Sequence, residues 1–393
     1  MADPVAGCVN RLRDWATGHP VDLAAFRIAV SVVVLFSVDV WTAAGWAHAA
    51  LPPVSEGLAR GVTALVLLSA FFTLIGLFTR ISSLVATLSL GWLLSVPQQS
   101  GQVMHTHHLL WFFAILAAAP AGDAWSLDAR RRPAEAPSLA HGVPVRVAWL
   151  SMGLIFFFPG VWKLNAGAAW LDGLPALVEW KWFQLADTPW VQLSPRVLWW
   201  GGVASIAFEL SFVALIISRR TRLLAVALAF LFHQGIWLVM GIVFSSLWLC
   251  DVVFLPWARW LRVPSTGVKT RAAWPSLALG VVLLGAQLFT GVTRRERSWP
   301  FACYPTFSDP APRAISWLEV EEVSPRGTEL VFSRGALRGR EAQRWWGVMA
   351  EQPPGVFYRQ WRGASPPDVS EVRYFRVTKQ LGAGVPPVRE RVR

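Results

Sequence analysis

The chain has 393 residues, of which 54% are hydrophobic and only 15% are charged. An average soluble domain carries roughly 25% charged residues. The chain also contains 24 tryptophans, a residue that concentrates where a bilayer meets water. This composition excludes an ordinary soluble protein and predicts a mostly α-helical membrane protein surrounded by lipid.

The formal net charge of +12 does not indicate a nucleic-acid partner. Most of the positive charge lies in short loops between apolar segments, where it sets the orientation of a membrane protein. The three cysteines, Cys8, Cys250 and Cys303, are far apart and show no metal-binding or redox spacing. We therefore expect neither a disulfide framework nor a bound metal.

Nine apolar segments approach the length of about 20 residues that a membrane-spanning helix needs. The eighth is the least secure, because only Gly241 separates it from the seventh. The segments are 23–46, 61–78, 82–97, 106–121, 145–164, 197–217, 222–242, 243–257 and 273–292. This pattern predicts a polytopic bundle of about eight or nine transmembrane helices over residues 23–293.

The positions of Lys and Arg predict the orientation of the bundle. With residues 1–22 in the cytoplasm, the loops on the cytoplasmic side carry most of the positive charge. These loops hold Arg80, Arg130, Arg131, Arg132, Arg219, Arg220, Arg222, Arg259, Arg262, Lys269 and Arg271, and the opposite loops hold Arg60, Lys181 and Arg196. Nine spans then place the C-terminal domain outside the cytoplasm, although Arg294, Arg295 and Arg297 lie on the side that the rule disfavours.

Residues 294–393 have the composition of a small soluble domain of mixed α and β structure. Residues 315–323 and 328–333 favour strands, and Pro325-Arg326-Gly327 between them favours a hairpin turn. Residues 372–377 predict another strand, and 339–351 predict a short amphipathic helix.

The loop 165–196 is long and contains Trp170, Trp180, Trp182 and Trp190. One interpretation is an interfacial helix that lies on the outer leaflet. The other is a lid over a site between the helices, and the two interpretations are compatible.

Ionisable side chains inside membrane spans are energetically costly and often mark a site. Lys163 lies near the outer end of the fifth segment, where burial would favour a neutral amine that can act as a general base. The alternative is a lysine whose ammonium group extends to the membrane surface. If Lys163 points toward lipid or head groups, with no cavity beside it, an enzyme that uses this lysine as a base is excluded.

Three histidines, His105, His107 and His108, begin the fourth segment at a depth similar to that of Lys163. No acidic or cysteine partner has matching spacing, so hydrogen bonding or proton relay is a better prediction than metal binding. Glu209 and His233 lie in the middle of the sixth and seventh segments, where they could form a buried polar contact or contribute to a site.

Four groups of residues carry a resemblance to a known family. They are His107-His108-Leu109-Leu110 followed by Trp125-Ser126-Leu127-Asp128, then Gly160-Val161-Trp162-Lys163-Leu164 with Trp170-Leu171-Asp172-Gly173, then Phe232-His233 with Gly241-Ile242-Val243-Phe244-Ser245, and Tyr304-Pro305-Thr306-Phe307-Ser308. In this order they resemble the vitamin K-dependent gamma-carboxylase family, in its bacterial branch of horizontally transferred transmembrane (HTTM) domain proteins. The resemblance implies a multi-pass protein of a bacterial-type inner (cell) membrane.

The resemblance also implies an activity. In the carboxylase, a lysine deprotonates vitamin K hydroquinone, and oxygen converts the resulting anion to a strongly basic alkoxide that yields the epoxide. That base removes the gamma proton of a glutamate, and the carbanion takes up carbon dioxide. Lys163 would be that base, assisted by His107 or, in an ungapped alignment, His105. We expect Trp162, Glu209 and His233 to contribute to the binding of reduced vitamin K or menaquinone. The chain lacks most of the luminal region of the animal enzyme, so the acceptor substrate stays unassigned.

We therefore expect a cavity between the fourth and fifth segments, lined by His107 and Lys163 and covered by the loop 165–196 or the tail. Glu209 is expected to lie too deep to contact Lys163. A non-enzymatic alternative is a membrane scaffold or a quinone-binding partner of another oxidoreductase. A transporter is disfavoured because no pair of segments shows interrupted repeats.

Overall fold

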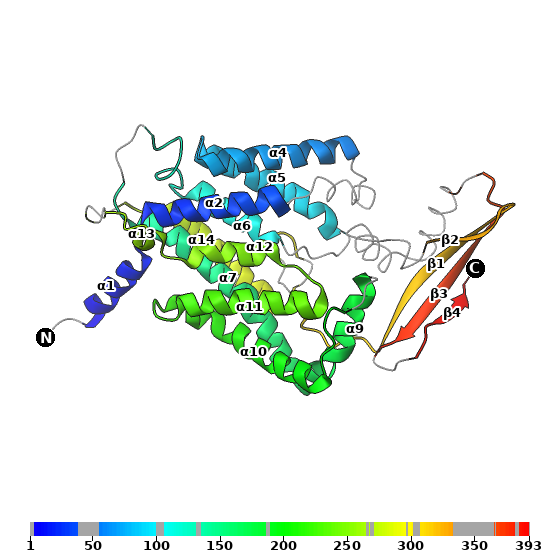
Figure 1. Cartoon of the computed structure of the whole chain (residues 1–393). Coiled ribbons are helices and arrows are strands. Elements are labelled where there is room, and N and C mark those ends of the chain that lie inside the picture. The colour runs from blue at the N-terminus through cyan, green and yellow to red at the C-terminus, as the bar shows by residue number, and fades with distance from the viewer. Residues whose placement is uncertain are drawn as a thin grey trace.

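A bundle of helices with a small β-sheet at one end makes up the protein (Figure 1). The computed structural model describes residues 4–37, 55–99, 106–130, 135–185, 189–264, 267, 271–295, 298–301, 307–332, 365, 367–381 and 385–392. The first helix, α1 (Pro4–Ala16), and the sheet lie at opposite ends of the bundle. The predicted membrane protein, helical bundle and small C-terminal β-containing region are thus confirmed.

Seven of the described helices are long and apolar enough to cross a membrane. They are α2 (Pro20–Ser37), α4 (Glu56–Ile75), α5 (Thr79–Gln99), α7 (Leu139–Ala166), α10 (Pro195–Ile217), α11 (Arg222–Met240) and α14 (Trp274–Val292). Each coincides with a predicted segment, although 38–46 of the first segment lies outside the described residues.

Two predicted segments are shorter than expected. The fourth forms α6 (His107–Ala118), and the eighth divides into α12 (Ser245–Trp248) and a 3₁₀ helix, η1 (Leu249–Phe254). At ~1.5 Å per residue, the 12 residues of α6 cover only about 18 Å, well short of a hydrocarbon core of ~30 Å. Gly241 ends α11 in the left-handed conformation, with a φ of 68°, and thereby separates the eighth segment from the seventh.

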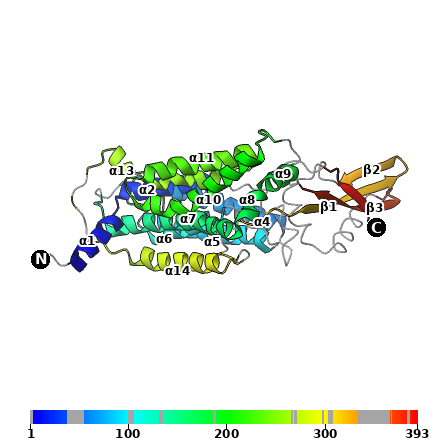
Figure 2. The same cartoon turned by 90° about the horizontal axis from the view of Figure 1, so that it is seen from below.

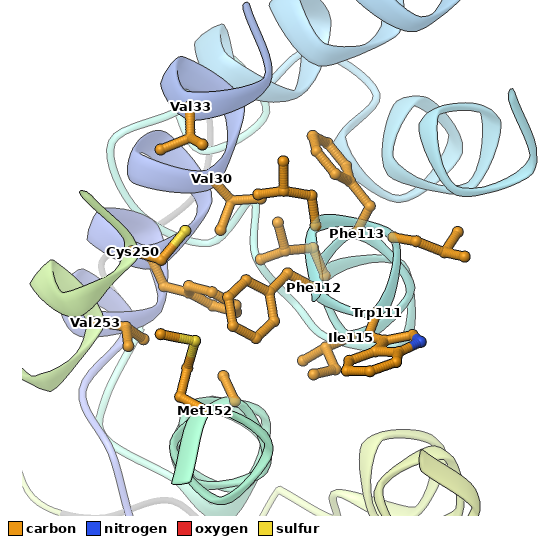
Figure 3. Packing of buried hydrophobic residues seen from close by; sticks show 14 of the residues in the cluster. Val30, Val33, Trp111, Phe112, Phe113, Ile115, Met152, Cys250 and Val253 are labelled. Carbon is orange, nitrogen blue, oxygen red and sulfur yellow. The ribbon is translucent and has the colours of Figure 1, made fainter. Parts of the chain in front are cut away.

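The core of the bundle surrounds α6 (Figure 3). Trp111, Phe112 and Phe113 of this helix are all buried, so α6 presents apolar side chains on every face. A helix with this pattern belongs in the interior of a bundle. Figure 3 shows Val30 of α2 and Met152 of α7 packed around it.

The loop 165–196 contains two of the shorter helices, α8 (Ala168–Asp172) and α9 (Leu174–Leu185). The helix α9 lies between the bundle and the sheet (Figure 1). A further short helix, α13 (Trp257–Trp260), lies near the other end of the bundle.

The sheet has four antiparallel strands in the order β2-β1-β3-β4. Their bounds are β1 (Ala314–Ser324), β2 (Gly327–Phe332), β3 (Glu371–Gln380) and β4 (Val388–Arg391). The three predicted strands and the hairpin turn are confirmed, because Ser324 pairs with Gly327 around Pro325 and Arg326. The fourth strand was not predicted, and the predicted helix at 339–351 lies outside the described residues.

One end of the sheet packs against α9 (Figure 2). A buried cluster of Ile315, Trp317, Val377 and Leu381 contacts Ala176 and Trp180 of that helix. Lys379 of β3 also forms an ion pair with Glu179, with 2.8 Å between Nζ and Oε1. These contacts hold the sheet beside the loop that follows Lys163.

Candidate functional site

Lys163 of α7 and Glu209 of α10 form a buried ion pair. The Lys163 Nζ donates a hydrogen bond to Glu209 Oε1, and only 4% of Lys163 and 3% of Glu209 are exposed. Glu209 is therefore a direct partner of Lys163, and the prediction that it lies too deep was wrong. The lysine does not extend to the membrane surface.

The packing of α7 against α10 explains this pairing. An added Cβ at Gly160, one turn before Lys163, would lie 2.9 Å from the Cβ of Glu209. The two backbones can approach this closely only because residue 160 has no side chain. In addition, the first turns of α10 extend past the end of α7 and pack on α8 and α9, where an added Cβ at Gly202 would meet Leu174 at 2.5 Å. The middle of α10 is thus level with the last turns of α7.

Glu209 can accept a further hydrogen bond. Its Oε2 atom is buried and has no hydrogen-bond partner among the described residues. A buried carboxylate oxygen without a donor is costly, so it would readily accept a hydrogen bond from a bound molecule or a water. Lys163 also lies 5.3 Å from the centre of the Trp170 ring, a cation–π contact.

A pocket of about 430 Å³ opens beside Lys163, between α10 and α11. Its wall is almost entirely apolar. Besides Lys163, it is lined by Trp170, Leu174, Val178, Leu193, Val197, Leu198, Gly201, Gly202, Ala204, Ser205, Phe208, Leu228, Leu231, Phe232, Gly235, Ile236, Val239, Met240 and Phe307. The pocket therefore offers one amine, one hydroxyl and a long hydrophobic wall.

Residues from the loop 165–196 and from the tail meet over Lys163. Trp170 of α8 donates a hydrogen bond from Nε1 to the carbonyl oxygen of Phe307, at 2.6 Å, and both residues line the pocket. Lys181 of α9 lies 5.1 Å from the centre of the Phe307 ring. The loop and the tail thus both contribute to the wall of the pocket, and the lid interpretation stays a prediction.

His107 does not share this pocket with Lys163. It begins α6, is fully buried, and its ring centroid lies 4.9 Å from that of Trp299. The pocket beside Lys163 lies between α10 and α11 rather than between the fourth and fifth predicted segments. The adjacent His108 contacts the carbonyl oxygen of Ser246 at 2.8 Å from Nε2. His105 lies outside the described residues.

Trp162 and His233 are buried but do not line the pocket. The Trp162 ring stacks on Phe158, with 5.9 Å between centroids. His233 is surrounded by aromatic rings, including Phe156 at 5.6 Å and Phe244 at 5.7 Å between centroids. Glu209 pairs with Lys163 rather than with His233. The role predicted for Trp162 and His233 in binding a cofactor stays a prediction.

Sequence reasoning missed the residues that shape the pocket. Gly201 and Gly202 of α10 and Gly235 of α11 line the pocket, and because glycine has no side chain, they leave room between the two helices. Within the described ranges, no group of three or more His, Cys, Asp or Glu side chains could hold a metal ion.

Comparison with known proteins identifies the family. The HTTM domain family matches residues 46–255, which include α4 to α12 and both members of the Lys163–Glu209 pair. No curated protein and no solved structure matches the chain. With more than half of its length covered by this match, the chain belongs to the HTTM domain family.

Proposed function

We propose that this integral membrane protein is a gamma-carboxylase-like enzyme that acts on a reduced quinone, with Lys163 as the base that receives the proton of the quinol hydroxyl. One observation carries the proposal. A buried amine lies at the end of an apolar pocket and has a carboxylate as its partner.

The pocket fits an amphiphilic ring with a hydrophobic tail. Its volume of about 430 Å³ lies within the ~300–1,000 Å³ that is usual for small-molecule sites. The hydroxyl of a quinol would contact Lys163, while its ring and tail would contact the apolar walls of α10 and α11. Leu231, on the rim, is 63% exposed, so the tail could continue into the lipid.

The pair can accept a proton once its own shared proton has moved from the Lys163 ammonium to the Glu209 carboxylate, because this transfer leaves Lys163 as a neutral amine. Lys163 and Glu209 together have no net charge, whether their shared proton is on the amine or on the carboxyl group. Gaining one proton makes the pair positive, and this charge would stabilise the quinol anion beside it. Exclusion of water from the site strengthens that attraction.

When bound, the quinol would supply the chemistry of its reaction with oxygen, which drives carboxylation with carbon dioxide in the family that the chain resembles. The contribution of this chain is to bind the quinol, orient its hydroxyl toward Lys163 and hold the proton on the Lys163–Glu209 pair. Trp170 and Phe307 would contact the bound quinol beside Lys163.

Epoxide formation tests the proposal. Purified protein is incubated with reduced menaquinone and oxygen, and the epoxide is measured by chromatography. We expect epoxide from the wild type and from Arg220→Gln, a control on the exposed turn between α10 and α11, and none from Lys163→Ala. No epoxide from the wild type, or equal amounts from Lys163→Ala, would refute the proposal.

A second candidate function is binding without catalysis, as a quinone-binding partner of another oxidoreductase. The apolar pocket between two lipid-facing helices favours it, since such a pocket needs no base in order to bind a quinone. Under this alternative, the wild type would bind reduced menaquinone but form no epoxide.

A further inference from the structure

A second pocket, of about 400 Å³, lies at the turn between α4 and α5. This turn is at the end of the bundle away from the sheet (Figure 1), so the pocket is remote from Lys163. It is lined by Phe78, Thr79, Arg80, Ile81, Pro120, Gly122, Asp123, Asp128 and Arg271. Unlike the first pocket, it contains four charged side chains.

Arg80 and Arg271 carry positive charge, Asp123 and Asp128 carry negative charge, and the four charges cancel. Burial would raise the pKa of Asp123, but hydrogen bonds from His141 and Arg271 outweigh it and keep that pKa below its ordinary value. Asp123 is therefore ionised at neutral pH. The lining thus offers a cation at Arg80 and an anion at Asp123, which a ligand with one charge of each sign can contact together.

Two of these charged groups have free hydrogen-bonding capacity. The side chain of Arg80 is exposed, and its guanidinium group forms no hydrogen bond or ion pair with the described residues. Asp123 uses Oδ2 for both His141, at 3.0 Å, and Arg271, which leaves Oδ1 without a hydrogen bond in the described part of the chain. Asp128, in contrast, accepts hydrogen bonds from the Phe78 and Thr79 backbones, at 3.0 and 2.8 Å, and fixes the turn.

The rim of the pocket is hydrophobic. Phe78 and Ile81 are each 65% exposed, beside the first turn of an apolar helix that can span the membrane. Exposed apolar side chains next to charged groups are typical of a surface that meets both acyl chains and lipid head groups. The ligand should therefore have an acyl part as well as two opposite charges.

We propose that this pocket binds the head group of a phospholipid with a primary ammonium group, such as phosphatidylethanolamine. The guanidinium of Arg80 binds the phosphate, and Asp123 accepts hydrogen bonds from the ammonium. Phe78 and Ile81 contact the acyl chains. A quaternary ammonium has no N–H to donate, and an anionic lipid has no cation for Asp123, so both are bound more weakly.

Native mass spectrometry of the detergent-solubilised full chain can test this site. Phosphatidylethanolamine, phosphatidylcholine and phosphatidylglycerol with identical acyl chains are titrated separately. We expect phosphatidylethanolamine to bind most tightly, and Arg80→Gln to weaken its binding about tenfold, as loss of a charge-assisted hydrogen bond does. Equal binding of the three lipids would overturn the proposal.

Arg220→Gln is the matched control, because Arg220 is also exposed and lies on a turn at the same end of the bundle. It removes the same charge, so it should leave the preference for phosphatidylethanolamine unchanged. Equal losses in the two variants would indicate attraction to positive charge in general and would contradict a specific site. Competition by water-soluble phosphoethanolamine would show that the head group alone suffices, whereas its failure to compete would assign the binding to the whole lipid.

Discussion

Lys163 and Glu209 are 46 residues apart in the chain, yet they form one ion pair inside the bundle. Each charge is almost fully removed from solvent, so each depends on the other for compensation. The pair ties α7 to α10 and at the same time places an amine at the end of the apolar pocket. Stability and the proposed chemistry therefore rest on the same two side chains.

Breaking this pair should destabilise the protein. Glu209→Leu leaves an uncompensated ammonium group in the bundle, which costs about 3–5 kcal/mol when a buried pair loses one partner. The double variant Lys163→Met/Glu209→Leu leaves no buried charge and should unfold at a temperature close to that of the wild type. Thermal unfolding in detergent measures both. A double variant less stable than Glu209→Leu alone would contradict this explanation.

Filling the pocket should block binding without unfolding the protein. An added Cβ at Gly235 meets no atom within 4 Å, and Gly235 lines the pocket, so Gly235→Leu can place its side chain there. We expect weaker binding of reduced menaquinone, measured by equilibrium dialysis in detergent. Gly285→Leu, on α14 and equally unobstructed, is the control that should retain binding. Equal binding by both variants would place the ligand elsewhere.

Lys181, in the loop 165–196, should make stability depend on pH. Burial lowers the pKa of Lys181 to about 8, below the 10.5 of a free lysine. Between these values the unfolded chain binds more protons than the folded protein, so the free energy of unfolding should rise as the pH increases from 8 to 10.5. Lys181→Met should lack this component of the rise. If the free energy of unfolding rose equally with pH in the wild type and in Lys181→Met, the rise could not be assigned to Lys181.

Much of the fold could be predicted because a membrane helix needs a long apolar segment, which the sequence displays directly. The seven long helices and the hairpin around Pro325 and Arg326 follow from such local patterns. The position of α6 in the interior of the bundle could not be predicted, because a helix buried within a bundle and one exposed to lipid are equally apolar. Only the surrounding helices distinguish the two.

The site was harder to predict because its depth was estimated along isolated helices. The charge of Lys163 in an apolar segment is visible in the sequence. The depth of Glu209 relative to Lys163 is not, because the sequence does not reveal that α10 extends beyond the end of α7. Phe307 lies almost a hundred residues after Glu209, and no local signal connects it with Lys163. Contacts of this kind depend on the tertiary arrangement.

The distribution of positive charge predicts that the sheet lies outside the cytoplasm. Because α1 and the sheet are at opposite ends of the bundle, a cytoplasmic N-terminus is consistent with this orientation. Alkaline phosphatase fused after Arg393 should be active in a bacterial host, whereas a reporter that is active only in the cytoplasm should be silent at the same position. The reverse pair of results would reject the orientation.

A comparison of binding and turnover in Lys163→Arg tests whether Lys163 is the base. A guanidinium can keep the ion pair with Glu209, but it stays protonated at neutral pH and cannot accept the proton of a quinol. We expect Lys163→Arg to bind reduced menaquinone as the wild type does and to form no epoxide. Epoxide formation by Lys163→Arg at the rate of the wild type would contradict the assignment of Lys163 as the base.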